Sequence, residues 1–343
     1  MKIKTSELRI FKSNATAIKG NTLLPVLSYL KFHDGTIIKH NLHAFLIQKV
    51  TTVNESFLVD EKILMGFIDN TRAEEIEIKI KDKRILISEV GGKAKITSPT
   101  DDVINFPTIE DEPEEKIILS KKVLNAIKIA SNFIVTETLM PLRSHVFIGK
   151  KNVGGSNSFI GYLEAQDEEL PQIILSKEVC AAISRMGVSS FSQSQRYHYF
   201  ENGNIRYGFI KPDCAFFDLT PFGVFDKKKL KHFSINKDEF IMFNDMCLSS
   251  TPSKIVRATF TVEKNKLKLQ MIDTEYEINN YREIDIDGEM EGEFTYQPVY
   301  MSHLLKSIPD SDLIFYQSHQ KYYITGDGNF AALIMQVIPE TNS

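Results

Sequence analysis

The sequence predicts an α+β protein built from three similar domains. Three observations support this prediction: a helix-start pattern that recurs six times, strand-like alternation between the recurrences, and two stretches with the composition of linkers. The composition fits a folded globular chain, because 42% of the 343 residues are hydrophobic and 25% are charged. A chain of this length is expected to divide into two or three domains.

A helix is predicted at each recurrence, where a capping residue is followed by an amphipathic run. Side chains of Ser, Asp and Asn accept hydrogen bonds from the unpaired N–H groups of a first helical turn. Gln297 is a weaker cap, but Pro298 after it suits the first helical position. The six predicted caps, about 55–60 residues apart, are Ser6, Asp60, Ser120, Ser176, Asn236 and Gln297.

Antiparallel strands are predicted between the helices, where apolar and polar residues alternate. The clearest runs are 75–88, 197–210, 256–273 and 313–326. Turn residues at Asp82-Lys83, Glu201–Asn204 and Glu263–Asn265 predict hairpins. Each repeat therefore comprises one helix and three or four strands. Because one such repeat has too little core to be stable alone, we expect the repeats to pair.

Paired repeats give three domains of about 114 residues, each a two-layer structure of helices on sheet. The stretch 107–116 is acidic and rich in proline, and 227–232 is mostly cationic. Both compositions are typical of linkers. We therefore expect domains at 1–114, 115–231 and 232–343.

The sequence shows no motif for a P-loop, an HExxH zinc site or a GxSxG nucleophile. The three cysteines, Cys180, Cys214 and Cys247, are far apart and predict buried thiols rather than metal ligands. The acidic cluster at 164–169 is expected to be a solvated loop. Residues 283–288 are expected to form a strand, since Phe294 stands where a calcium loop needs a glutamate. We expect no catalysis, no cofactor and no metal.

No apolar run reaches the roughly 18–20 residues of a membrane span, so no membrane partner is expected. The first residues, MKIKTSELRIF, interleave charged and apolar side chains and do not read as a signal peptide. We therefore expect a cytoplasmic protein. The net charge of −4 argues against holding nucleic acid through overall charge, but it allows a local basic face.

Several segments, taken in order, resemble the bacterial DNA polymerase III beta subunit, the sliding clamp family. Residues 20–37, with their Asp34-Gly35 turn, resemble a segment of the family's first domain, and Phe106-Pro107 resembles its "FP" before the first linker. Residues 118–135 and 171–186 are similar to the helices of the second domain. The ending, 300–308 with 331–339, resembles the last helix and the C-terminal strand. The chain is identified as a divergent member by the order and spacing of these segments.

This resemblance implies three similar domains per chain and two chains closed head to tail around duplex DNA. Helix packing supplies an independent test, since neighbouring helices lie about 8–10 Å apart. Twelve helices then give a circumference of about 110 Å and an opening of about 25 Å, whereas six leave less than about 10 Å. One chain is therefore expected to be half of a ring, and the family places the dimer contact between the first domain and the partner's third.

A ring that encircles DNA needs only a few cations facing phosphate, and such contacts read no sequence. The helices of the last two repeats offer fewer cations, chiefly Lys237 and Lys306. The expected DNA-facing residues on or beside the helices are Lys12, Lys19, Lys62, Arg72, Lys121, Lys122, Lys128, Lys177 and Arg185. The resemblance adds Arg143, in a loop that the family uses near the DNA.

The resemblance also implies a hydrophobic cleft between the second and third domains, where partner proteins insert short peptides. The implied partners are the replicative DNA polymerase and the clamp-loader ATPase. Residues 156–161 differ from the family's "TDGHRL"-like run, and the chain continues past its "MPMRL"-like ending, so the cleft is expected to take a different peptide. The expected cleft residues are Leu142, Phe159, Gly161, Met335, Val337 and Ile338.

The leading hypothesis is a homodimeric processivity factor that tethers the replicative polymerase to DNA. The alternative within the same fold is a clamp-like scaffold that binds replication proteins without encircling DNA. A third alternative is an enzyme whose catalytic residues meet only in space and leave no sequence motif.

Overall fold

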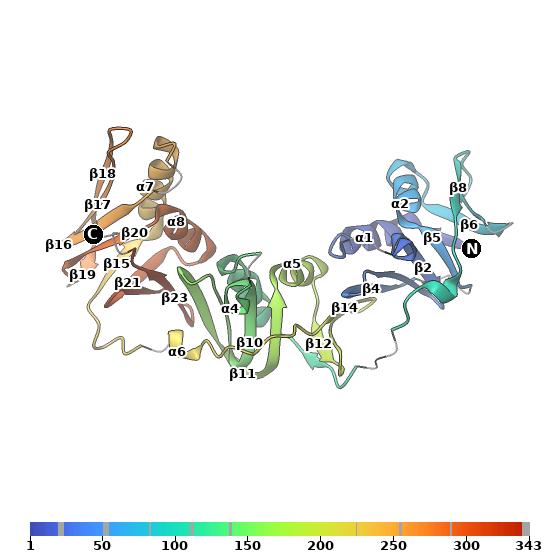
Figure 1. Ribbon diagram of the computed structural model, residues 1–343, viewed down its shortest axis with the longest axis horizontal. Helices are drawn as coiled ribbons and strands as arrows, with labels where there is room; N and C mark the ends of the chain where they lie inside the picture. The colour runs from blue at the N-terminus through green and yellow to red at the C-terminus, as the bar shows by residue number, and fades with distance from the viewer. Residues whose placement is uncertain are drawn as a thin grey trace. The chain divides into compact units, whose positions relative to one another are not determined.

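The computed structural model describes residues 1–19, 24–50, 55–81, 84–109, 111, 113–136, 139–223, 225–253, 256–288 and 290–337. Helices and antiparallel sheets are mixed along the chain, which confirms the α+β prediction (Figure 1). The chain divides into two compact units. Unit 1 comprises Met1–Ser120 and Ala181–Asp213, and unit 2 comprises Lys121–Cys180 and Cys214–Ser343.

Unit 1 contains an eight-stranded and a four-stranded sheet. The strand order of the larger sheet is β5-β2-β3-β4-β14-β13-β12-β9, and that of the smaller is β1-β6-β7-β8. The strands are β1 (Lys2–Lys4), β2 (Tyr29–His33), β3 (Thr36–His40), β4 (Ala44–Lys49), β5 (Phe57–Asp60), β6 (Glu75–Lys81), β7 (Arg84–Glu89), β8 (Lys95–Pro99), β9 (Ile117–Ile118), β12 (Ser190–Gln193), β13 (Tyr197–Asn202) and β14 (Ile205–Ile210). Helices α1 (Thr5–Ala15) and α2 (Glu61–Asn70) lie side by side, and the short turns η1 (Pro25–Ser28) and η2 (Val103–Asn105) complete the unit.

Unit 2 contains a seven-stranded sheet, β10-β11-β23-β22-β21-β15-β19, and a four-stranded sheet, β18-β17-β16-β20. The strands are β10 (His145–Ser156), β11 (Ile160–Ser176), β15 (His232–Asn236), β16 (Ala258–Glu263), β17 (Lys266–Asp273), β18 (Ile278–Asp285), β19 (Asp287–Gly288), β20 (Gly292–Tyr296), β21 (Asp312–Ser318), β22 (Lys321–Thr325) and β23 (Phe330–Met335). Its helical segments are α3 (Lys121–Ala130), η3 (Ser131–Phe133), α4 (Pro141–Ser144), α6 (Thr220–Gly223), α7 (Lys237–Ser250) and α8 (Pro298–Ser307). Helix α5 (Lys177–Met186) crosses the division between the units.

All six predicted helices are present, and most begin at their predicted caps. The Asp60 carboxylate accepts the amide of Ile63 at 2.9 Å, and the Asn236 side chain accepts the amide of Asp238 at 3.1 Å. Pro298 occupies the first turn of α8, as expected. The prediction of a cap at Ser6 is wrong. Helix α1 already begins at Thr5, because β1 runs into it and the Thr5 amide bonds to the Glu74 carbonyl at 2.9 Å.

Two of the three predicted hairpin turns lie within the described residues, and both are confirmed. Strands β13 and β14 meet at 203–204, and β16 and β17 meet at Lys264-Asn265, where both residues have positive φ (47° and 65°). Positive φ at both central residues fits the twist of a two-residue hairpin. The Asp82-Lys83 turn lies outside the described residues.

The third repeat departs from the predicted pattern, since α3 is followed by two long strands, β10 and β11. The prediction of a loop at 164–169 is wrong, because this acidic cluster lies within β11. The pairing of β10 with β11 shifts register between Ile148 and Asn152, and Asp167, Glu168 and Glu169 remain exposed on the strand. An irregular strand can thus carry a solvated acidic cluster.

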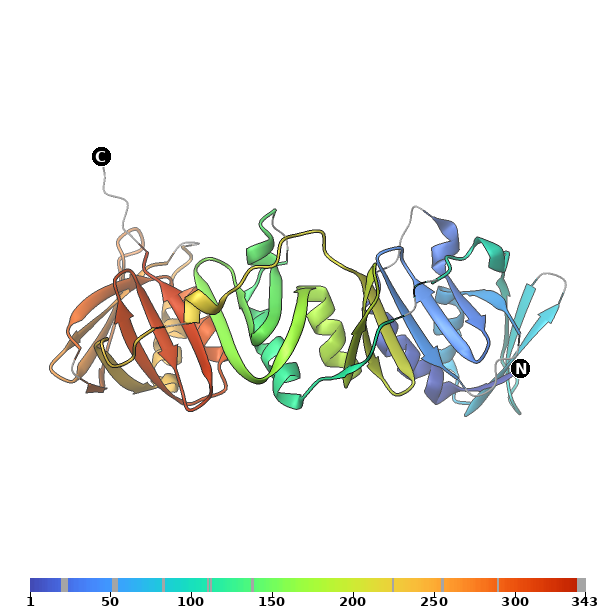
Figure 2. The same cartoon turned by 90° about the horizontal axis from the view of Figure 1, so that it is seen from below.

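The described parts of both predicted linkers are irregular, apart from His232, which begins β15. Figure 2 shows the segment 214–223, which precedes the second predicted linker, in yellow and crossing the strands β10 and β11. The sheets continue across the predicted domain boundaries, since β4 pairs with β14 and β11 pairs with β23. The three-domain division therefore remains a prediction.

The thiols of Cys180 and Cys247 are buried and that of Cys214 is half-buried, and burial raises the pKa of Cys247 to about 12. Within the described ranges, no cluster of three or more His, Cys, Asp or Glu side chains could hold a metal ion. Likewise, none of the described helices has the length and apolarity that crossing a membrane requires.

Candidate functional site

Ion pairs join neighbouring helices within each unit. In unit 1 the Lys12 ammonium on α1 pairs with Asp69 on α2. In unit 2 the Lys306 ammonium on α8 pairs with Asp245 on α7 at 2.7 Å, and the Ser302 hydroxyl donates to the same carboxylate at 3.0 Å. Each unit thus has an interhelical ion pair, although the lysine lies on the first helix of the pair in unit 1 and on the second in unit 2. These cations help to hold the helices together.

The ten predicted DNA-facing residues fall into two groups. The first group makes bonds within the protein: Lys12, Lys122, Arg143, Lys177 and Arg185. The remaining residues are exposed on or after a helix: Lys19, Lys62, Arg72, Lys121 and Lys128. Exposed cations can reach a phosphate, so the second group is the better set for a DNA contact.

The bonds of the first group fix the surroundings of α3. The Lys122 ammonium lies 2.9 Å from the Asp167 carboxylate, and Lys177 donates to the Ile134 carbonyl at 3.1 Å. Arg143 was expected in a loop, but it lies in the short helix α4, where its Nε donates to the Asn157 carbonyl at 3.2 Å. Arg143 therefore anchors the turn between β10 and β11.

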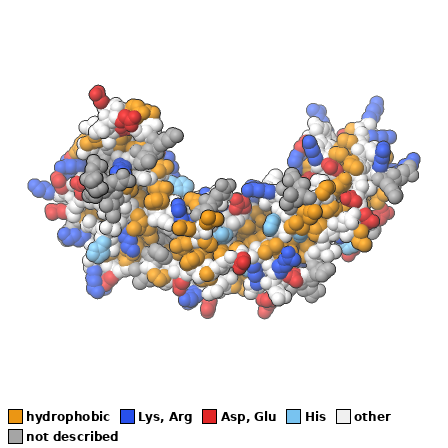
Figure 3. All heavy atoms as spheres, viewed as in Figure 1, with side chains coloured by type: hydrophobic (Ala, Val, Ile, Leu, Met, Phe, Trp, Pro, Cys, Tyr) orange, Lys and Arg blue, Asp and Glu red, His pale blue; other side chains and the backbone are white. Residues whose placement is uncertain are grey.

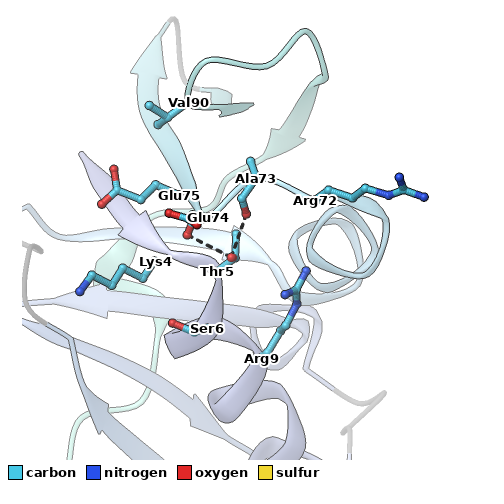
Figure 4. Close-up of a pocket in the computed structure, with 9 residues that line it drawn as sticks. All are labelled: Lys4, Thr5, Ser6, Arg9, Arg72, Ala73, Glu74, Glu75 and Val90. Carbon is cyan, nitrogen blue, oxygen red and sulfur yellow. Dashed lines mark hydrogen bonds between the residues drawn. The ribbon is translucent and has the colours of Figure 1, made fainter.

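A cavity of about 680 Å³ at the start of α1 contains a cation that the sequence prediction missed (Figure 4). Arg9 lies one turn before Lys12 on α1, and its Nη2 donates to the Thr71 carbonyl at 2.9 Å. In Figure 4 the Arg72 side chain extends away from the other lining residues. Because Glu74 and Glu75 also line the cavity, its charges largely balance and it has no clear preference for an anion.

The predicted peptide cleft lies where β11 pairs with β23, within unit 2. Among the described residues of the predicted cleft, Gly161 alone lines the cavity found there. The volume of that cavity is only about 10 Å³. Space of this size holds about one water molecule at most. The aliphatic side chains of Leu163, Leu219 and Leu333 line it as well.

The other described residues of the predicted cleft do not line this cavity. Leu142 packs against the buried cluster that contains Phe147 and Leu219. Phe159 is 39% exposed and its ring stacks on Tyr300, with 4.8 Å between centroids.

The chain after β23 is held by backbone bonds. The Met335 amide donates to the Phe159 carbonyl at 2.9 Å, and the Val337 amide donates to the Thr295 carbonyl at 2.9 Å. Ile338 lies outside the described residues. Sequence reasoning missed Leu163, Leu219 and Leu333; no sequence pattern singled out Leu219, which lies before the predicted linker 227–232.

Polar bonds fasten the segment 214–223 beside this cavity. The Asp218 carboxylate lies 3.0 Å from the Lys150 ammonium and accepts the Thr220 amide at 2.9 Å. The Thr220 hydroxyl in turn accepts a bond from the Asn152 side chain at 2.9 Å. Hydrogen bonding to Thr220, helped by Lys150, lowers the pKa of Asp218 to about 2. The segment 214–223 is therefore held in place by charge as well as by its apolar residues.

Comparison with solved structures gives full-length matches to bacterial replication proteins. The chain is similar to the DNA polymerase III subunit beta of Pseudomonas aeruginosa, with a TM-score of 0.86 and 15% identity over 98% of this chain and 99% of that one. It is similar to the DNA polymerase sliding clamp of Caulobacter crescentus (TM-score 0.85, 15% identity, 98% and 99% covered). The beta subunit from the DNA polymerase of Streptococcus pyogenes matches equally well (0.84, 16%, 98% and 99%).

No protein-family model matches the sequence. No curated protein matches it either. The chain therefore has the fold of the DNA polymerase III beta subunits over almost its whole length, at a sequence identity that shows the fold alone.

Proposed function

We propose that this protein, which has the fold of a DNA polymerase III beta subunit, is a DNA sliding clamp. Two copies form a ring around duplex DNA and tether the replicative polymerase, without catalysing a reaction. The observation that carries this proposal is the match of the complete chain, helices and sheets alike, to proteins described as sliding clamps. Six helices per chain also agree with the packing arithmetic, in which twelve helices leave an opening of about 25 Å.

The ring requires a contact between two copies, and two sheet edges suit it. Strand β8 ends the small sheet of unit 1 and β18 ends the small sheet of unit 2. An edge strand presents unpaired backbone groups that a strand of another chain can complete. Pairing β8 of one copy with β18 of the other would close a ring head to tail.

Exposed side chains on the two edges complement each other. The unit 1 edge presents Ile96, 36% exposed, beside the exposed Lys95, and Figure 3 shows Lys and Arg side chains over α2 and β8. The unit 2 edge presents Tyr281, 54% exposed, with the exposed acids Glu283 and Asp285. Apolar contact would supply affinity, and opposite charge would set the orientation.

The ring would contact DNA through its exposed helix cations. Lys62, Lys121 and Lys128 are exposed on α2 and α3, and they suit phosphate contacts that read no sequence. A net charge of −4 keeps such contacts weak, which a sliding ring needs.

Partner proteins would dock where β11 meets β23. The aliphatic cavity there is too small for a side chain as it stands, so Leu163, Leu219 and Leu333 would have to move apart to admit an apolar side chain of a short peptide. We propose the replicative polymerase and the clamp-loader ATPase as the partners that bring such peptides.

The test is retention on DNA before and after the DNA is cut. The protein is loaded on a nicked circular plasmid with a clamp loader, isolated by gel filtration, and the plasmid is then linearised. A sliding ring remains on the circle and leaves the linear form. Equal retention on both forms would rule out encirclement.

One observation favours the scaffold alternative. Helix α7 carries three acids, Asp238, Glu239 and Asp245, against one lysine, and its Met242 is 57% exposed. This surface is poor for phosphate and better suited to a protein. A monomer of 39.1 kDa at micromolar concentration would support the scaffold, whereas a dimer of about twice that mass would support the ring.

A further inference from the structure

We propose that a groove on the eight-stranded sheet of unit 1 binds a short acidic peptide segment of a partner protein, one that also carries apolar side chains. The groove, called here the unit 1 groove, has a volume of about 300 Å³. It lies where β3, β4 and β14 meet, on the sheet face that the first linker crosses. The residues that matter are Ile38, Ile47 and Ile205 on the apolar side and Lys49, Lys116, Arg206 and Glu201 on the charged side.

The floor of the unit 1 groove is apolar. Ile38 and Ile47 face each other across β3 and β4, and both are only half-buried. The linker residue Ile109 packs on Phe45 and Tyr197 farther along the same face. The linker therefore covers the aromatic part of this face and leaves the isoleucines accessible.

The rim of the unit 1 groove is positive. Lys49, Lys116 and Arg206 stand against one carboxylate, Glu201, so three cations face one anion. Glu201 is 7% exposed and uses both carboxylate oxygens within the protein: one pairs with Lys116, and the other accepts Arg206 Nε at 2.5 Å. Glu201 thus positions two of the cations, and the excess positive charge remains for an incoming anion.

Arg206 is held in an orientation that suits a carboxylate. Its guanidinium lies over the Tyr199 ring, 5.8 Å from the centroid, and only Nε is used by Glu201. The two Nη groups are the arms of the fork that binds carboxylates. The linker acid Glu114 bonds instead to Gln193 on β12.

An acidic peptide fits this groove better than nucleic acid does. Half-buried isoleucines gain nothing from a phosphate backbone but gain from apolar side chains. A volume of about 300 Å³ is at the lower end of ligand sites and is enough for two or three side chains. The proposed ring contact, DNA contacts and β11–β23 cleft use none of these residues, so this inference and the proposed function can fail separately.

The test uses the full-length protein and three fluorescent hexapeptides in an anisotropy titration. The first is Glu-Leu-Asp-Leu-Glu-Asp, the second replaces both leucines with serine, and the third replaces the acids with lysine. We expect binding of the first peptide alone. Replacing the exposed rim cation, Lys49→Glu, is expected to weaken it about tenfold, since charge reversal removes one attraction and adds a repulsion.

A matched control is Lys151→Glu, which reverses an exposed lysine on β10 outside the groove and should leave binding unchanged. Arg206→Gln is a second variant, which removes the guanidinium fork while Lys116 still pairs with Glu201. Equal binding of the serine peptide, or displacement of the probe by a short DNA duplex, would overturn the proposal. So would the absence of binding, or equal weakening by the control.

Discussion

The two large sheets join repeats that are distant in sequence, and they do so in the same way. One join is β4–β14 in unit 1, between the first and fourth repeats, and the other is β11–β23 in unit 2, between the third and sixth. Each entering strand follows the same turn, in which the side chain of Asn41 or Asn157 accepts the amides two and three residues ahead. The next residue has positive φ in both turns, 76° at Leu42 and 78° at Ser158. The two joins can therefore be compared position by position, although the side chains have diverged.

The large residue of each join lies on opposite strands in the two units. Phe45 on β4 lies opposite Gly208 on β14, whereas Gly161 on β11 lies opposite Leu333 on β23. Each join thus pairs one large residue with one glycine, but opposite strands supply the large one. Close packing requires the space to be filled and does not specify which strand fills it. As a consequence, unit 1 has an aromatic join and unit 2 an aliphatic one.

The largest expected difference between the joins is in their response to acid. His40 and His198 in the sheet of unit 1 are buried, and burial lowers the pKa of each to about 4. The unfolded chain has the ordinary value of about 6.5, so it binds protons first. Stability is therefore full above about pH 6.5 and falls until about pH 4, by about 2–3 kcal/mol for each histidine.

Hydrogen exchange followed by mass spectrometry, corrected for intrinsic rates, measures this loss. We expect β4 and β14 to lose protection between pH 6.5 and 4 before β11 and β23 do. The described histidines of unit 2 are half-buried or exposed: His145, His232, His303 and His319. The variant His198→Phe, whose ring can pack on Phe191 and Phe209, should reduce the effect by about half. Equal loss in both joins would contradict the prediction.

The next largest difference is expected from one substitution made at both glycines. An added Cβ at Gly208 would lie 2.2 Å from the Phe45 ring, while one at Gly161 would lie 3.4 Å from Leu333. Gly208→Ala should therefore destabilise its join by about 1–3 kcal/mol, because a packed ring must move. Gly161→Ala should cost less than about 1 kcal/mol, since it also restricts the unfolded chain.

Chemical denaturation with exchange as the local probe compares the two alanine variants. Local exchange is needed because a protein of several units need not unfold in one step. A double variant, Gly208→Ala with Phe45→Leu, should recover part of the loss by making room for the methyl group. If both single variants were equally stable, the strand that supplies the large residue would make no difference to the stability of the join.

The sequence predicted the fold better than it predicted the sites. The six helices and the hairpins follow from local signals, the caps and the turn residues, which act within a few positions. The failure at Ser6 came from outside that range, since the Thr5 amide bonds to the distant Glu74 carbonyl and the helix already begins at Thr5. Local patterns do not show which distant carbonyl will be present.

The sites depend almost wholly on such distant contacts. Lys12 was chosen for its place on a helix, but its partner Asp69 lies on the next helix. Leu219 lines the cavity at Gly161 from the segment 214–223, which no sequence pattern singled out. A cation or an apolar residue can be located from the sequence, but whether it is already bonded requires the fold.

A smaller difference is expected at the turns that lead into the joins. Phe159 stacks on Tyr300, whereas the matching residue of the unit 1 turn is the exposed His43. Phe159→Ala should lose about 1 kcal/mol of local stability, the usual contribution of an aromatic pair. His43→Ala should lose less than about 0.5 kcal/mol, as an exposed substitution. Exchange of the backbone amides of Ile160 and Ala44 reports the two turns, and equal effects would show that the stack contributes nothing.

The smallest effect concerns the segment 214–223, which packs beside the β11–β23 join. The pKa of Asp218 is lowered to about 2 by hydrogen bonds from Thr220 and by Lys150, so its contribution is present above about pH 4 and is lost toward pH 2. The side chain is 43% exposed, and solvent screening limits that contribution to less than about 1 kcal/mol. Exchange of the Thr220 amide should accelerate between pH 4 and 2 beyond its intrinsic rate. The experiment is best done with His198→Phe, which limits acid unfolding of unit 1.

The control variant Asp218→Asn should abolish the pH dependence, because its side-chain oxygen still accepts the Thr220 amide but no longer titrates. A pH dependence that survives this substitution would assign the effect to another group.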